Sequence, residues 1–349
     1  MYLIFLTIIF FLVLFLPFLN KRIEKNLEAF FFIMGSFSIL NALFFKKEGI
    51  SITFHFAIKC LEEPIMIALA CLISGLLFHR FQKEIKLAIS TLEKKLNLFF
   101  PFLLIVLLGF ISSIITAIIA SLVLAEIIAD LSMRRKEKIA FCVFACFSIG
   151  LGAALTPIGE PLSTIAISKL KGGPHNAGFF FLFNLLFPYI AFGIIAVGLL
   201  GILVYKKGKC TIQIEKREEK KEIKRVFIHS AKVYLFIIAL LLLGEGFKPL
   251  VNLYVSKLSP FTLYLVNISS SILDNATLTA CEIGSYMSLF QIKASLLSLL
   301  ISGGMLIPGN IPNIISAERL GIGMKEWAKI GIPIGVIFLA AFFISLFIL

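Results

Sequence analysis

Two carboxylate side chains lie inside apolar stretches of this chain, next to hydroxyl and amide groups. Glu160 lies within Thr156-Pro-Ile-Gly-Glu-Pro161, and Asp274 lies within Ser270-Ser-Ile-Leu-Asp-Asn275. An ionisable side chain at membrane depth is costly, so its presence indicates a functional site. Carboxylate, hydroxyl, amide and carbonyl oxygens are the ligands that hard cations prefer. The two stretches therefore predict a site at which Glu160 and Asp274 bind Na⁺ when they are ionised and H⁺ otherwise.

The other polar residues near these stretches are candidate ligands of the same ions. They are Ser113, Thr116, Thr156, Asn275, Thr277, Asn310 and Asn313. A hydroxyl in a membrane helix can instead bond to its own backbone or allow close packing, so this structural role stays open for each Ser and Thr. Glu126 and Glu282 lie late in two apolar segments and are candidates for a proton relay, whereas Glu318 lies near a helix end, where we expect it to be solvated.

Two pairs of prolines, each four residues apart, interrupt apolar segments. The pairs are Pro157 with Pro161 and Pro308 with Pro312. A proline inside a helix removes one hydrogen bond and crowds a carbonyl, so each pair predicts about one unwound turn. The freed carbonyls can coordinate a cation, and the next half-helix can hold an anion at its N-terminus. The breaks alone do not show whether a cation or an anion binds, so the side chains near them have to indicate the sign of the ion. No Lys or Arg lies in these stretches, which favours a cation over a large carboxylate.

The composition is that of a polytopic membrane protein. Mean hydropathy is +1.02, with 59% hydrophobic and 15% charged residues, whereas a soluble domain has about 25% charged residues. The net charge of +13 comes from Lys and Arg in short loops beside apolar spans. This is the positive-inside pattern, and it does not indicate a nucleic-acid surface. The six Cys form no CxxC pair and the four His are isolated, so the sequence predicts no cofactor and no enzymatic activity.

The order of apolar segments predicts an all-α fold with two repeats of inverted topology. Each repeat contains a re-entrant helical hairpin followed by a transmembrane helix that Pro and Gly interrupt. The expected units are extra N-terminal helices at 1–63, a first repeat at 64–205 (hairpin 97–132, broken helix 139–168), a basic cytoplasmic linker at 206–225, and a second repeat at 226–349 (hairpin 259–288, broken helix 290–316). Basic flanks place the linker in the cytoplasm and both termini outside the cell membrane.

At these residues the chain resembles the ion-transporter superfamily, which includes NhaD-type sodium/proton antiporters, arsenite permeases and dicarboxylate carriers. The segment 154–161 is similar to the Thr-Pro-Ile-Gly-Asp stretch of the NhaD-type antiporters, with Glu160 in place of Asp. The segment 272–275 resembles their Asp-Asn hairpin, and 309–315 resembles a Gly-Asn-Ile-Pro-Asn-Ile-Ile stretch of related members. Within the superfamily the chain looks closest to a family of cation transporters. The first hairpin tip, Ser112-Ser-Ile-Ile-Thr116, departs from the Ser-Asn-Thr tip of the carboxylate carriers.

The resemblance implies two inverted repeats, ion sites between each hairpin tip and the neighbouring break, and often a homodimer. Together with the oxygen ligands, it predicts a secondary active transporter, a Na⁺/H⁺ antiporter that works by alternating access in the lipid bilayer. Two alternatives stay open: a Na⁺-coupled symporter of a small carboxylate-type anion, and an anion transporter similar to arsenite permeases.

Overall fold

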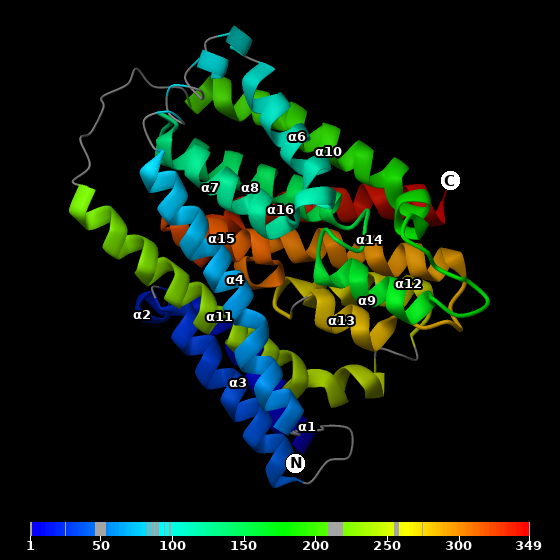
Figure 1. The fold of residues 1–349 in the computed structure, drawn as a ribbon. Helices are drawn as coiled ribbons and strands as arrows, with labels where there is room; N and C mark the ends of the chain where they lie inside the picture. Colours follow the sequence, from blue (N-terminus) through cyan, green and yellow to red (C-terminus); the bar gives the residue numbers. More distant parts are fainter. Residues whose placement is uncertain are drawn as a thin grey trace.

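The computed structural model describes residues 2–348 except 25, 46–53, 82–83, 85–86, 88–90, 94, 98, 209–218, 255–257 and 274. All regular elements in this part of the chain are helices, as predicted (Figure 1). Five apolar segments among the described residues are long enough to cross a membrane: α1 (Tyr2–Leu19), α3 (Leu27–Phe44), α10 (Phe181–Gly208), the stretch Val226–Phe247 of α11 (Glu219–Tyr254), and α16 (Met324–Phe347). The protein is therefore an all-α, multi-pass membrane protein.

The N-terminal helices form a bundle with α11 along one side of the molecule (Figure 1). This bundle contains α1, the short α2 (Lys21–Glu24), α3 and α4 (Phe54–Arg80). Small residues let α3 and α11 approach closely, because a Cβ on Gly35 would lie 2.8 Å from the Leu242 Cβ and one on Gly246 would lie 2.0 Å from the Ser38 Oγ. Such close approach of helix backbones is how membrane helices gain packing energy.

The middle of the chain forms a first unit of five helices. Two arms, α6 (Phe99–Ile115) and α7 (Ala117–Asp130), meet at Thr116, which has a positive φ of 77°, and both contact α8 (Arg135–Ala153). The chain unwinds after α8 and resumes as α9 (Pro161–Leu170), with Pro161 at the first helical turn, where its missing N–H costs no hydrogen bond. The unit ends with α10, which packs along α8.

The end of the chain forms a second unit with the same order of elements. Its first arm is α12 (Pro260–Val266) continued by the 3₁₀ helix η1 (Asn267–Ser271), and its second arm is α13 (Asn275–Glu282). Next comes α14 (Leu289–Met305), whose start is fixed by a capping box between Ser288 and Gln291. A short 3₁₀ turn, η2 (Ile307–Gly309), separates α14 from α15 (Ile311–Leu320), and α16 then packs along α14.

Contacts between the two units are reciprocal. The second arm of the first unit, α7, packs against α15, and the second arm of the second unit, α13, packs against α9. In the same way α4 contacts α7, and α11 contacts α13. Each two-armed segment is therefore held by the half-helix that follows the break of the other unit.

One predicted helix boundary differs from the structure. The motif Glu62-Glu63-Pro64 predicts a helix start, but α4 begins at Phe54 and continues through Pro64, because a long helix tolerates the loss of one hydrogen bond. The predicted linker at 206–225 is partly helical, since α10 continues to Gly208 and α11 begins at Glu219. Lys and Glu, which dominate the linker, are good helix formers. Residues 209–218 lie outside the described residues.

Candidate functional site

The first break exposes backbone carbonyls that are then bonded from within the first unit. Thr164 Oγ1 donates to the Pro157 carbonyl at 2.6 Å, and the amide of Ala117, directly after the turn between α6 and α7, donates to the Gly159 carbonyl at 2.8 Å. Thr156 Oγ1 donates to the Ser113 carbonyl. Of these two hydroxyls, that of Thr156 joins the first arm to the unwound chain, and that of Thr164 joins the unwound chain to the half-helix that follows it.

The second break is closed by an amide side chain. Asn313 Nδ2 donates to the carbonyls of Gly303 and Leu306, both at 2.8 Å. These are the carbonyls that a continuous helix would have bonded to the backbone. The Asn313 Oδ1 is buried and accepts no hydrogen bond, and the same is true of the Ser302 Oγ one helical turn before the break. Asn313 therefore stabilises the break with its nitrogen and leaves its oxygen available.

The second break lies against α8 of the first unit. A Cβ on Gly150, near the end of α8, would lie 2.7 Å from the Nδ2 of Asn310, which directly precedes α15. Cys146 Sγ lies 3.5 Å from the Pro312 carbonyl oxygen and 3.4 Å from the Ser316 Oγ. Because α8 and α14 also contact each other, the second break is buried against the helix that leads into the first break.

The predicted ligands lie at different places around the two breaks. Glu160 is 5% exposed and directly precedes α9, with Thr116 at the facing turn. Asn275 is buried, and its Nδ2, which makes no hydrogen bond, lies 3.5 Å from the position of a Cβ on Gly303. Thr277 lies elsewhere, since a Cβ on Gly244 of α11 would lie 2.6 Å from its Oγ1. Asp274 lies outside the described residues.

The two candidate relay residues have different surroundings. Glu126 forms a bidentate ion pair with Arg319, with Nε–Oε1 and Nη2–Oε2 distances of 2.6 and 2.8 Å. This pair joins α7 to α15, and a relay at Glu126 stays a prediction. Glu282 is 2% exposed, and its hydrogen-bond donors within the described part of the chain are neutral, the amide of Asn267 and the hydroxyl of Ser295.

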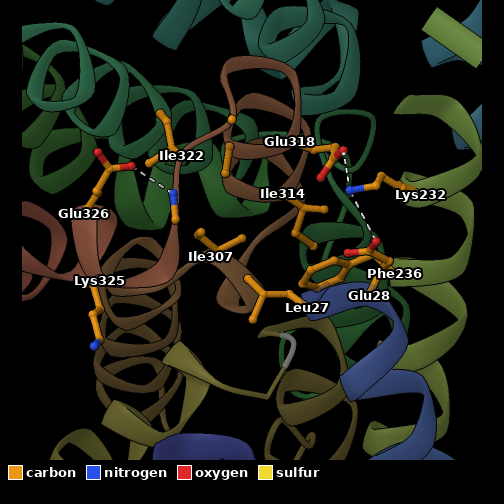
Figure 2. A pocket seen from close by; sticks show the side chains of 13 residues that line it. Leu27, Glu28, Lys232, Phe236, Ile307, Ile314, Glu318, Ile322, Lys325 and Glu326 are labelled. Atoms are coloured by element: carbon orange, nitrogen blue, oxygen red, sulfur yellow. Dashed lines mark hydrogen bonds and ion pairs between the residues drawn. The ribbon is translucent and has the colours of Figure 1, made fainter. Parts of the chain in front are cut away.

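A cavity of about 530 Å³ lies between the N-terminal bundle and the second unit. Its walls come from the starts of α3 and α16, from α11, η2 and α15, and Ile307 of the second break lines it (Figure 2). Figure 2 shows Lys232 of α11 between two carboxylates, with Nζ 3.3 Å from Glu28 Oε1 and 3.2 Å from Glu318 Oε1. The cavity therefore connects a charged rim to the second break.

Glu318 is a correction to the sequence analysis, which expects it to be solvated. Its side chain is 28% exposed and pairs with Lys232. Burial raises the pKa of the Glu318 carboxyl above its ordinary value, although the Lys232 ammonium opposes the rise. Sequence reasoning also missed Lys232, Glu28 and Asn267. Their partners are distant in the chain, and the one available signal was a charged residue inside or beside an apolar span.

Comparison with known proteins supplies a family but no activity. None of the curated proteins matches this chain. The profile of a family described as a protein of unknown function, DUF1646, matches residues 3–349. The resemblance to the ion-transporter superfamily therefore stays a prediction. Because the match covers nearly the whole sequence, the chain belongs to the DUF1646 family.

Proposed function

We propose that this protein is a secondary active transporter of the cytoplasmic membrane, a cation/proton antiporter whose cation is Na⁺. The observation that carries this proposal is the packing of two interrupted helices, α8–α9 and α14–α15, against each other in the interior, with the buried Glu160 at the first break. Interrupted helices in corresponding places of two repeated units are the arrangement from which transporters build ion sites.

Glu160 supplies the charge at the first break. An ionised carboxylate that is 5% exposed pays a desolvation penalty of several kcal/mol. Binding either H⁺ or Na⁺ offsets that penalty, so the two ions compete for one carboxylate. Competition at a single site is sufficient for antiport, because the protein crosses between its two states only when an ion neutralises the site. From its place in the sequence, Asp274 takes the same part in the second unit.

The arrangement of the units supports alternating access. The reciprocal contacts of α7 with α15 and of α13 with α9 are those expected of two repeats related by a twofold axis in the membrane plane. The cavity beside Ile307 would connect the second break to the cytoplasm. In this proposal the arms and the broken helices move against the N-terminal bundle and α11, and the contact of Lys232 with Glu318 changes during the movement.

The test uses purified protein in sealed proteoliposomes with a trapped pH-sensitive dye and an imposed pH gradient. We expect Na⁺ to collapse the gradient in the wild type. Glu160→Gln, which keeps the shape of the side chain but cannot ionise, should abolish the response. Glu62→Gln is the matched control, because Glu62 is an exposed residue of α4. Exchange at the wild-type rate by Glu160→Gln would refute the proposed role, and Na⁺-dependent uptake of a labelled anion would replace antiport with symport.

A further inference from the structure

A second buried carboxylate lies at the end of α13, away from Glu160. Glu282 Oε2 accepts from the Ser295 Oγ at 2.8 Å and from the Asn267 Nδ2 at 3.1 Å. The same Asn267 nitrogen lies 2.9 Å from the Ser298 Oγ. These four side chains come from α13, η1 and α14 and are each at most 2% exposed. They form one polar cluster inside the apolar interior of the second unit.

The cluster has more acceptor atoms than donors. Glu282 Oε1 and Asn267 Oδ1 are buried and receive no hydrogen bond, although each belongs to a side chain whose other polar atom is bonded. Among the residues that the structure describes, every side chain that donates to Glu282 is neutral. A buried carboxylate without a positive partner has to be neutralised by a proton or by a bound cation. Two unbonded oxygens beside two serine hydroxyls are suitable ligands for a hard cation.

The cluster continues toward the second break. Ser295, Ser298 and Ser302 recur every three or four residues on α14, so they lie on one face of the helix. Ser302 also has a buried oxygen without a hydrogen bond, and it is adjacent to Gly303, where Asn313 bonds the break. At about 1.5 Å per residue, this row of hydroxyls covers about 10 Å of the helix. A cation at Glu282 would therefore have a polar route to the candidate site.

We propose that Glu282, Asn267, Ser295 and Ser298 form a second cation site, distinct from the centre at Glu160, that takes a dehydrated Na⁺. A single carboxylate among neutral oxygens matches one positive charge, so the site selects a monovalent ion over a divalent one. This inference deepens the proposed function, because a second site on the same route would let the transporter load one ion before it releases another. Binding at this site does not require transport, so the two proposals can fail separately.

The experiment measures equilibrium binding of radioactive Na⁺ to the purified full-length protein in detergent, at mildly alkaline pH, with choline as the balancing cation. We expect the double variant Glu160→Gln, Asp274→Asn, which removes both carboxylates of the proposed transport site, to keep saturable Na⁺ binding, and the triple variant that adds Glu282→Gln to lose it. Ser295→Ala, which retains the carboxylate, should weaken the remaining binding by about tenfold or more. Ser270→Ala is the matched control, because Ser270 is an equally buried serine of η1 that donates to the Leu299 carbonyl outside the cluster.

Two results would overturn the site. One is Na⁺ binding that the double variant Glu160→Gln, Asp274→Asn abolishes, which would leave Glu282 as a protonated residue of the packing. The other is binding that Ser295→Ala and Glu282→Gln leave unchanged. Loss of exchange in proteoliposomes with intact binding at Glu282 would count against the proposed antiport and leave this site standing. If Glu282→Gln does not give monodisperse protein, the comparison of Ser295→Ala with Ser270→Ala decides.

Discussion

Replacing Lys232 by Met should destabilise the protein by leaving two carboxylates without their shared cation. Lys232 Nζ lies 3.3 Å from Glu28 and 3.2 Å from Glu318, and the three side chains are 33%, 11% and 28% exposed. At an effective dielectric constant of about 20, each attraction amounts to ~5 kcal/mol before desolvation is subtracted. Removing one partner costs about 3–5 kcal/mol in buried pairs, and exposed pairs are worth about 0.2–1 kcal/mol. For these partly buried groups we expect Lys232→Met to lower the free energy of unfolding by about 2–3 kcal/mol.

The assay is thermal unfolding of the purified protein at several pH values. With about 2.1 cal/mol/K of unfolding entropy per residue over 349 residues, the loss corresponds to a drop of roughly 3–4 °C in Tm. Because the folded pKa of Glu318 is raised, the stability that this carboxyl contributes is present below its unfolded pKa and is lost as pH rises through the folded pKa. Removing the ammonium raises that pKa further. The deficit should therefore be small near pH ~4 and grow toward alkaline pH.

Two variants separate the charge effect from loss of packing. Lys232→Arg keeps the positive charge and should stay close to the wild type. Adding Glu318→Gln to Lys232→Met removes one uncompensated carboxylate and should recover part of the lost Tm. A deficit in Lys232→Met that is the same at all pH values, or that Glu318→Gln does not reduce, would refute the electrostatic reasoning.

Three further predictions concern packing around the two breaks. Replacing Glu126 by Gln or Arg319 by Met should each cost about 2–4 kcal/mol, and the double variant should cost less than the sum, as a thermal-unfolding cycle would show. Gly152→Ala places a Cβ 1.8 Å from a carbonyl oxygen of α6 and should cost about 1–3 kcal/mol or more, whereas Gly172→Ala, with no atom within 4 Å, should leave Tm unchanged. The single Trp, Trp327, is fully buried, and its Nε1 donates to the carbonyl of Gly304 in α14, just before the second break. Its fluorescence should therefore resist aqueous quenchers, and ready quenching by iodide would contradict this packing.

The interruptions of the helices could be predicted because their causes are local. Pro157 with Pro161 and Pro308 with Pro312 lack the N–H groups that a continuous helix would need at their positions, and the chain unwinds there. The limits of α4 could not be predicted in the same way. A motif typical of a helix start at Pro64 lies inside a longer helix, since the remaining backbone hydrogen bonds decide the outcome.

The partners of the polar residues could not be predicted, because they depend on how distant helices pack. Arg319 lies 193 residues from Glu126, and no spacing rule connects them. Asn313 could be placed near a break, but its role in bonding the Gly303 and Leu306 carbonyls required the folded geometry. For the same reason Glu282 could be named as a buried acid from the sequence, whereas its link to Asn267 and Ser295 emerged only when α13, η1 and α14 were assembled.

The reciprocal packing of α7 on α15 and of α13 on α9 has a consequence for how the protein is made. During synthesis the ribosome releases α7 long before α15 exists. The arms α6 and α7 are therefore in the bilayer while Glu126 and the polar turn at Thr116 are still uncovered. Neither half can complete its own interior alone. The first and second units, expressed as separate polypeptides, should therefore be degraded when each is made alone and should persist when both are made in the same cell.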